Sequence, residues 1–361
     1  MRDDGGAVAV LVAILLAAGV LTGLLAITVD VGRVYAERRI VQNGADSASL
    51  ALAQKCAEGD PNVSGEPCDT QALALSAAEA RANADAPDGA TGVTEVCGTT
   101  PLAGCVPREA TWTECKSVDG AKFKHFVRVH TQTQEANGDS FLVPYFAHLL
   151  SGGSDEVPVA ACSQTAWGPA ASAIINLAIL LPVCPGVPGD DIARVIEDFD
   201  PNDPDDPNCT VEGVAYPGVT KGFAFGQLPG QTKECTDPVE VSVGDIIPIE
   251  TSVTQWCGNK LEDSLGTLLG QKLIVPVVGA HTKTGQGQYD FSVLSFKYFT
   301  FMGYKIKNQS GGDEPTGGWN STVCGHGAKR SCLYGEFSST VVSGDVGGGP
   351  DLGVRAIQLI P

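Results

Sequence analysis

An uncharged apolar run from Ala7 to Val29 is the strongest hydrophobic pattern in the chain, and its most polar members are two threonines. As a helix this run spans about 34 Å, which exceeds the roughly 30 Å of hydrocarbon in a bilayer. Helices buried in soluble proteins rarely stay apolar on every side for so long. The preceding residues lack the basic character of a signal peptide, and the run is longer than a typical signal-peptide core. The pattern therefore predicts a retained transmembrane helix.

The same helix is predicted to continue beyond the apolar run. No proline occurs between Val29 and Gly59, and apolar or small residues recur mostly at three- and four-residue steps. We therefore expect the helix to reach about Cys56. Small side chains permit close packing, and the sequence leaves open whether the chain's own folded region or another protein covers them. This packing seam consists of Val31, Val34, Val41, Ala45, Ala48 and Leu52.

The rest of the chain is predicted to be rich in strands. Residues 70–86 form an alanine-rich helix with Asp69 as its N-cap. Residues 123–134 alternate, which places Arg128 and His130 on one strand face and the valines on the other. Further expected elements are a short helix or turn at 143–150, a buried strand or core segment rather than a second membrane span at 170–183, and a strand pair in 239–253. Strands are also expected at 157–167, 272–278, 289–306 and 351–360, and a short helix carries Leu261, Leu265, Leu268 and Leu269.

These elements predict an α+β fold class. A single N-terminal transmembrane helix continues into a long helix, and a β-rich, disulfide-bonded extracytoplasmic region follows. The high content of glycine (44) and proline (22) suits such a loop-rich region. The expected divisions are an anchor and helical extension at 1–57, a loop and second helix at 58–89, a first β-rich part at 90–189, an acidic linker at 190–208 and a second β-rich part at 209–361.

Charge and cysteine usage indicate the compartment. The net charge of −19 argues against nucleic-acid binding. All 12 cysteines follow the apolar run without a C-x-x-C motif, which favours disulfides in an oxidising compartment over a zinc site. Local bridges are expected between Cys97 and Cys105 and between Cys324 and Cys332. Disulfides place the part of the chain after the apolar run outside the cytoplasm. Three arginines just after the run favour the opposite orientation under the positive-inside rule, although long domains translocate regardless of flanking charge.

The sequence contains no motif that predicts a catalytic, cofactor-binding or metal-binding residue. Asp198, Asp200 and Asn202 have the spacing of a calcium loop, but Asp203 replaces its glycine and Cys209 its final glutamate. There is no G-x-S-x-G, P-loop or H-E-x-x-H sequence. A catalytic triad built from distant residues is defined by geometry and leaves no such motif. We therefore expect no enzyme activity and no cofactor, and we identify no small-molecule substrate.

The segment that follows the apolar run resembles the N-terminal module of the TadE/TadG-like proteins of the tight-adherence (Flp) pilus system. In that family the pattern is D-x-G-R-x-Y-x-x-R-x-x-x-Q-N-A-A-D-A-A-A-L-A. Gly44, Ser47 and Ser49 replace alanines of the pattern here, and the D-x-S-x-S metal motif of some TadG proteins is absent. The matching positions are Asp30, Gly32, Arg33, Tyr35, Arg38 or Arg39, Gln42, Asn43, Ala45, Asp46, Ala48 and Leu50.

The resemblance implies a structural, non-catalytic role in the assembly of a tight-adherence pilus or in its anchoring to the envelope. The expected location is the cell membrane, with a single span and most of the chain outside the cytoplasm. The expected partners are the membrane and pilus-assembly or envelope proteins. Two other functions stay open from the sequence: a surface binding module or adhesin that uses the β-rich region, and a membrane-tethered hydrolase.

Overall fold

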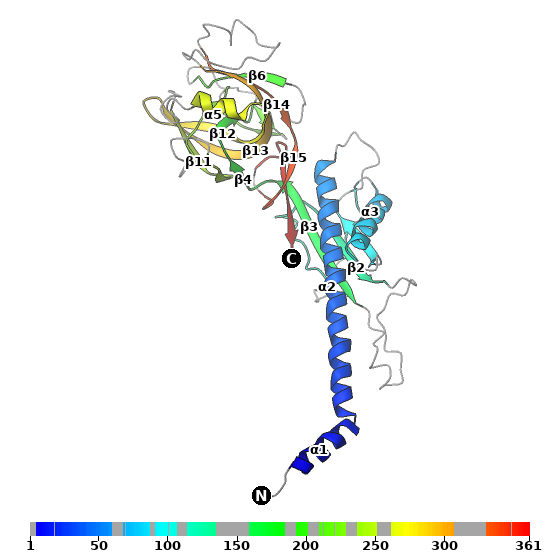
Figure 1. Cartoon of the computed structure of the whole chain (residues 1–361). Coiled ribbons are helices and arrows are strands. Elements are labelled where there is room, and N and C mark those ends of the chain that lie inside the picture. The colour runs from blue at the N-terminus through cyan, green and yellow to red at the C-terminus, as the bar shows by residue number, and fades with distance from the viewer. Residues whose placement is uncertain are drawn as a thin grey trace. The chain divides into compact units, whose positions relative to one another are not determined.

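The computed structural model describes two compact units (Figure 1). Unit 1 comprises Met1–Gly120, His125–Ala166 and Leu359–Pro361, and unit 2 comprises Ala121–Lys124 and Trp167–Gln358. The residues that the structure describes are 5–17, 19–59, 68, 70–86, 91–99, 101–106, 114–134, 159–184, 193–200, 209–211, 213–219, 221–228, 237–250, 261–306, 330–347 and 349–361.

Two helices form the N-terminal part of unit 1, whereas the sequence predicts one. Helix α1 spans Gly5–Ala17 and helix α2 spans Val20–Glu58. Gly19 lies between them in the left-handed conformation, with φ 71°, which a residue without a Cβ adopts at little cost. The expected continuous helix is therefore corrected to a helix that breaks at Gly19 and extends past Cys56. Within the described residues, no helix has both the length and the apolar character that crossing a membrane requires.

The C-terminal half of α2 lies against strand β2 (His125–Thr133), whose neighbours in the sheet are β1 (Thr91–Gly98) and β3 (Ala160–Pro169) (Figure 1). Helix α3 (Gln71–Ala84) contacts both α2 and β1. Its N-cap is Thr70, whose hydroxyl accepts a hydrogen bond from the backbone N–H of Leu73 at 3.3 Å. The residue expected as the cap, Asp69, lies outside the described residues.

Strand β2 does not keep one buried and one exposed face. Its residues from Val127 to Thr131 are all buried, although the alternating sequence predicts two different environments. Thr131 faces α2, because its hydroxyl donates to the carbonyl oxygen of Val41 at 2.9 Å. Arg128 instead contacts the segment that contains Lys116. Both faces of the strand are thus covered within unit 1, and the alternation indicates two buried faces of different polarity.

Unit 2 is built on a seven-stranded sheet. The strand order is β6-β14-β13-β12-β5-β9, and β11 also pairs with β13. Strand β13 (Gln288–Lys305) has partners on both edges, as the apolar sequence of the predicted central strand indicates. The others are β5 (Ile179–Pro182), β6 (Ala193–Glu197), β9 (Ala224–Phe225), β11 (Ile246–Glu250), β12 (Lys272–Gly285) and β14 (Cys332–Ser338).

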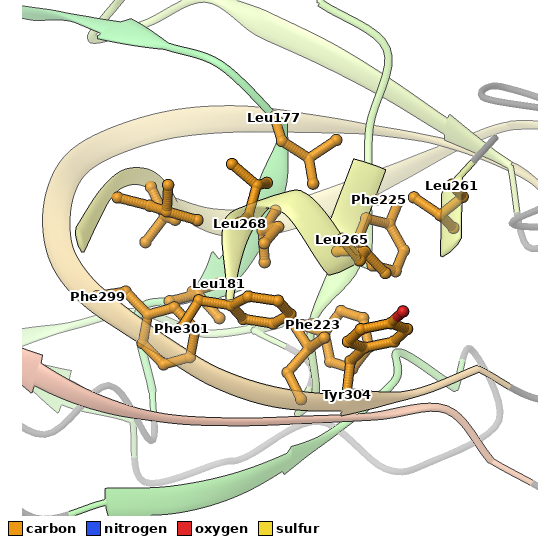
Figure 2. Close-up of a cluster of buried hydrophobic side chains, with 14 of the residues drawn as sticks. Leu177, Leu181, Phe223, Phe225, Leu261, Leu265, Leu268, Phe299, Phe301 and Tyr304 are labelled. Atoms are coloured by element: carbon orange, nitrogen blue, oxygen red, sulfur yellow. The ribbon is translucent and has the colours of Figure 1, made fainter. Parts of the chain in front are cut away.

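The core of unit 2 lies between this sheet and helix α5 (Leu261–Leu268), whose leucines are turned toward the phenylalanines of β13 (Figure 2). Leu261, Leu265 and Leu268 are buried at positions i, i+4 and i+7, the spacing that one helix face requires. Phe299 and Phe301 are fully buried beneath the helix. Leu269 packs at the edge of the cluster, so all four leucines of the predicted helix contribute to the core.

Shorter strands complete unit 2. The strand pair expected in 239–253 is present as β10 (Val239–Ser242) and β11, but β10 pairs with β4 (Ser172–Ile175) and β11 pairs with β13. Gly244, with φ 93°, lies between the two strands. The other pairs are β7 (Thr210–Val211) with β8 (Val214–Ala215) and, in parallel, β15 (Thr340–Ser343) with β16 (Val354–Ile360).

The acidic segment at 190–208, expected as a domain boundary, is not the division between the units. Its residues 193–200 belong to unit 2, where β6 pairs with β14 and Arg330 forms ion pairs with Glu197 and Asp198. Backbone pairing and this arginine integrate the segment into the unit despite its linker-like composition. The predicted helix or turn at 143–150 and the remainder of the acidic segment lie outside the described residues.

Candidate functional site on helix α2 and strand β3

The predicted packing seam of α2 divides into an exposed part and a buried part. Val31 is 46% exposed and Val34 is half-buried. Val41, Ala45, Ala48 and Leu52, by contrast, are buried inside unit 1, with exposed fractions of 2% or less. Val41 and Ala45 form a small apolar cluster with Ala161 of β3. Of the two possible partners for the buried part, the chain's own strands therefore provide the cover.

The residues of the family-like motif also include both exposed and buried positions. Asp30 is buried, Arg33 is half-buried, and Tyr35 is 63% exposed. A side chain at Gly32 would meet no heavy atom within 4 Å, and Asn43 is exposed. Gly32 and Tyr35 thus lie on an open part of the helix surface, whereas Asp30 is covered, and the sequence alone does not distinguish the two environments.

A polar stripe on α2 faces strand β3. Gln42 Nε2 donates to Asp46 Oδ1 at 2.9 Å and to the carbonyl oxygen of Cys162 at 3.3 Å. One helical turn further, Ser49 is fully buried and its hydroxyl hydrogen-bonds with those of Ser163 at 3.0 Å and Thr165 at 2.9 Å. Positions 42, 46 and 49 share one helix face. Because buried hydroxyls and amides require partners, this stripe fixes the rotation and register of α2 on β3.

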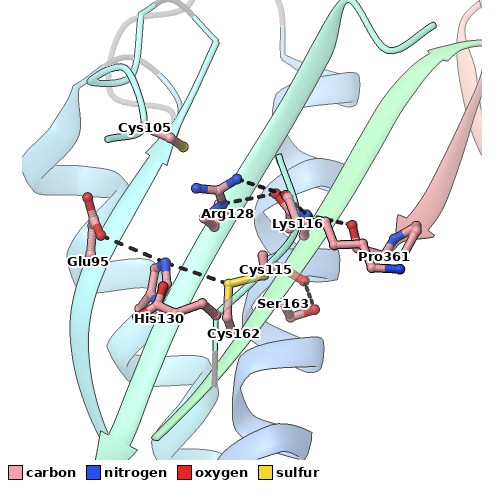
Figure 3. The surroundings of a disulfide bond; sticks show 12 residues. Glu95, Cys105, Cys115, Lys116, Arg128, His130, Cys162, Ser163 and Pro361 are labelled. Carbon is pink, nitrogen blue, oxygen red and sulfur yellow. Dashed lines mark hydrogen bonds and ion pairs between the residues drawn. A yellow bond between two sulfur atoms is a disulfide. The ribbon is translucent and has the colours of Figure 1, made fainter. Parts of the chain in front are cut away.

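A second polar network lies on β2 and β3. Arg128 is buried, and its Nε donates to Gln164 Oε1 at 2.9 Å. Its terminal nitrogen donates to the carbonyl oxygen of Lys116 at 3.1 Å (Figure 3). The Gln164 amide, also fully buried, donates to the same Lys116 carbonyl at 2.9 Å and to a Pro361 oxygen at 2.8 Å. This network ties the 114–120 segment and the chain's last residue to β3.

His130 lies next to a disulfide in the same unit. Cys115 and Cys162 are bonded, and the Cys162 sulfur is 3.6 Å from His130 Nε2 (Figure 3). The ring is 5% exposed and lies between two carboxylates: Glu95 Oε2 is 3.8 Å from Nε2 and Glu114 Oε2 is 3.7 Å from Nδ1. Sequence reasoning predicts a structural or surface role for the histidines and gives no signal that brings His130 to a cysteine.

A cavity of about 390 Å³ opens beside this disulfide. Gln42 and Asp46 of the polar stripe line it, together with both cysteines of the disulfide. The remaining lining residues are Glu114, Lys116, Ser163, Leu359, Ile360 and Pro361. Motif residues, a disulfide and acidic groups therefore meet at one hollow of unit 1, which makes this face the candidate functional site.

The candidate disulfides of the sequence have different outcomes. The structure brings Cys97 and Cys105 together in a disulfide. Cys332 is buried and disulfide-bonded, but Cys324 lies outside the described residues, so that pairing stays a prediction. The three other described bonds, which sequence spacing did not predict, join Cys56 to Cys68, Cys115 to Cys162 and Cys184 to Cys209.

Unit 2 contains a second cavity, of about 350 Å³. Leu181, Val277 and Leu352 are among its apolar lining residues, and Lys297, only 1% exposed, also lines it. The Lys297 ammonium lies 4.7 Å from the centre of the Phe337 ring. The sequence indicates a central strand here but does not single out this lysine.

Comparison with known protein families gives a match that includes the motif of α2. The match covers residues 6–54 and is to the family described as putative Flp pilus-assembly TadE/G-like. The N-terminal segment carries a TadE/G-like domain. This domain includes α1 and nearly all of α2, and therefore both the exposed surface and the polar stripe. Neither the curated proteins nor the solved structures yielded a match to the chain.

Proposed function

We propose that the protein is a membrane-anchored structural component of tight-adherence pilus assembly. The observation that carries this proposal is the TadE/G-like match over residues 6–54, the segment in which the apolar run leads directly into the α2 motif. The TadE/G-like match itself suggests involvement in Flp pilus assembly. The membrane anchor, the non-catalytic role and the surface that partners use belong to the proposal.

Exposed apolar side chains along α1 and the start of α2 support the membrane anchor. Val10, Leu11 and Ile14 of α1 and Leu24 and Ile27 of α2 are each more than half exposed in the isolated chain. A continuous apolar surface of this kind requires a covering, and lipid supplies one along an uncharged run. The break at Gly19 falls within the run, so the anchor in this proposal contains a bend.

The disulfides support an extracytoplasmic location for both units. Four disulfide bonds join cysteines of the described residues, and such bonds persist in oxidising compartments. An anchor at the N-terminus followed by units outside the cytoplasm satisfies this requirement. The arginines after the apolar run oppose that orientation, and protease treatment of cells with an opened outer envelope distinguishes the two orientations, since an outside domain is degraded without lysis.

The anchor is tested by introducing charge into the apolar run. Aspartate at the centre of a membrane helix costs roughly 2.5–3.5 kcal/mol, so the pair Leu11→Asp and Leu15→Asp is expected to release the chain from carbonate-washed membranes. Val106→Asp adds a similar charge at an exposed site of unit 1 and serves as the control. Retention of the double variant in the washed membrane fraction would refute the anchor.

The open part of α2 is the surface that we assign to a pilus-assembly partner. Tyr35 and Val31 are exposed there, and large aromatic side chains commonly dominate interface energies. In a strain without the chain, the wild type is expected to restore pili, whereas Tyr35→Ala reduces the number of piliated cells at least tenfold at equal membrane levels. Leu73→Ala, an exposed position on α3, is the control. Normal piliation without the chain would refute the assembly role itself.

A second candidate function, a surface binding module, is favoured by the cavity of unit 2. Its volume lies at the low end of the range for ligand pockets. Its lining joins apolar side chains and the buried Lys297 with Lys221 and the ion pairs of Arg330 to Glu197 and Asp198. Because Arg330 pairs with those two carboxylates, Lys297 and the apolar side chains suit a small amphipathic anion. Calorimetric titration with decanoate tests this function, and decanol serves as the uncharged comparison. Binding of decanoate should be lost in Lys297→Met. It should be retained in the control Lys283→Met, which changes an exposed lysine. Absence of decanoate binding would exclude this ligand class.

A further inference from the structure

The disulfide between Cys115 and Cys162 has surroundings that favour chemistry at sulfur. It joins the segment before Gly120 to strand β3, and the Cys162 sulfur lies 3.6 Å from His130 Nε2. A disulfide breaks when a thiolate attacks one sulfur and the other leaves as a thiolate. A group that stabilises the leaving thiolate therefore accelerates exchange. His130 is placed to do this for Cys162 (Figure 3).

Two carboxylates flank the His130 ring. Glu95 of β1 lies near Nε2 and Glu114 lies near Nδ1, at 3.8 and 3.7 Å. The carboxylates orient the ring, and a histidine next to a cysteine sulfur stabilises the thiolate when it forms. The ring is also almost completely shielded from solvent, which strengthens its electrostatic effect on the sulfur.

A reagent has a route to this bond. Both cysteines line the cavity of about 390 Å³, and both are only partly buried. Cys97, Cys184 and Cys209, in two of the other disulfides, are buried. The Cys115–Cys162 bond thus combines an imidazole contact with an adjacent open space.

We propose that Cys115–Cys162 is an exchange-active disulfide that reacts with small thiols. The thiolate of the incoming thiol attacks the Cys115 sulfur and forms a mixed disulfide. The electron pair of the broken bond moves to the Cys162 sulfur, which leaves as a thiolate beside the His130 ring. A second molecule of the thiol then attacks the mixed disulfide. The sum of these steps is two thiols and one protein disulfide converted to one small-molecule disulfide and two protein thiols.

The charge of the cavity determines which thiols react. Its charged lining residues are two carboxylates, Asp46 of α2 and Glu114, and one lysine, Lys116. The excess of carboxylates repels an anionic thiol and attracts a cationic one. The class of reactant is therefore a small cationic or neutral thiol, and cysteamine should react faster than 2-mercaptoethanesulfonate, a thiol of similar size with the opposite charge.

The experiment follows reduction of the folded full chain over time. Samples are treated with cysteamine or 2-mercaptoethanesulfonate, trapped with iodoacetamide and analysed by peptide mapping. The disulfides Cys56–Cys68, Cys97–Cys105 and Cys184–Cys209 act as internal references in the same molecule. We expect Cys115 and Cys162 to be alkylated first, with cysteamine at least tenfold faster than the sulfonate. Earlier reduction of a reference disulfide would overturn the proposal without any variant.

Two variants test the role of His130. A leaving thiol of lower pKa departs faster, so His130→Gln is expected to slow reduction of Cys115–Cys162 by roughly tenfold. The reference disulfides should be reduced at unchanged rates in this variant. The control His125→Gln changes an exposed histidine of the same strand, and all of its disulfides should be reduced at the wild-type rates. If His130→Gln does not fold, Glu95→Gln should slow the reaction in the same direction. An unchanged rate in the folded variant would refute the assigned role.

Discussion

Replacing Gly44 by alanine should stabilise unit 1, although the position is buried in a helix interface. A Cβ built at Gly44 lies 3.5 Å from its nearest neighbours, Ala82 and Thr91, which is ordinary van der Waals contact. Alanine is favoured over glycine in a helix interior by about 0.8–1.0 kcal/mol. The new methyl group also gains contacts without displacing any. We therefore expect a gain of about 1 kcal/mol, or an increase in Tm of roughly 2–4 °C for a unit of this size.

The assay for Gly44→Ala is differential scanning calorimetry of the full chain in detergent with its disulfides intact. Gly98→Ala provides the contrast, because a Cβ at Gly98 would overlap the Phe126 carbonyl oxygen on the adjacent strand β2. That variant should lower the Tm of the same unit. Loss of stability in Gly44→Ala would show that α2 and α3 approach more closely than the structure has them, and the reasoning from contact distances would fail.

Three further changes test the core, a helix end and one carboxylate. Phe299→Ala removes a fully buried ring and should cost unit 2 about 3–5 kcal/mol in urea unfolding, and a loss below 1 kcal/mol would contradict its central place in the core. Thr70→Ala should cost about 1 kcal/mol because the N-cap bond to Leu73 is lost, whereas Thr70→Asp should retain most of the stability. The hydrogen bond from Gln54 is the main cause that lowers the pKa of Glu58. The stability it contributes is present above the unfolded pKa and is lost as the pH falls through the folded pKa; Glu58→Gln should remove this acid-dependent fraying in hydrogen exchange.

Elements with a strong periodic pattern could be predicted from the sequence. The leucine spacing of α5 and the apolar sequence of β13 both reflect burial of a defined face, and the two elements pack together in the core of unit 2. The alanine-rich helix α3 also lies where composition predicts it, at Gln71–Ala84. In each case local propensity and tertiary burial favour the same structure, which is the condition under which sequence patterns are reliable.

The structure differs from the sequence-based prediction where the backbone conformation of one residue or contacts with distant residues determine the local structure. The break before α2 depends on the left-handed conformation of Gly19, and an apolar run gives no sign of which glycine will adopt it. The segment 193–200 resembles a linker because of its acidic residues, but pairing of β6 with β14 integrates it into unit 2. Strand pairing over such a separation leaves no local pattern in either segment.

The contacts of the candidate site likewise could not be predicted from the sequence. The motif residue Gln42 could be identified on α2 from the sequence, but its partner on β3, the Cys162 carbonyl, is 120 residues away. The surroundings of His130 likewise combine side chains from β1, β2, β3 and the 114–120 segment. The sequence therefore identifies which residues form the motif, and the structure identifies what each of them contacts.

The distribution of these contacts along α2 separates two roles within one motif. From Val41 onward, small side chains and the Gln42–Asp46–Ser49 stripe are used to hold the helix on its own sheet. Substitutions there act first on folding, so loss of pili in such variants would not identify a partner-binding residue. Val31 and Tyr35, further toward the N-terminus of α2, carry exposed side chains, so substitutions there remove little buried structure. An interaction surface on α2 should therefore be mapped with substitutions in its N-terminal half, where a change in assembly can be separated from a change in stability.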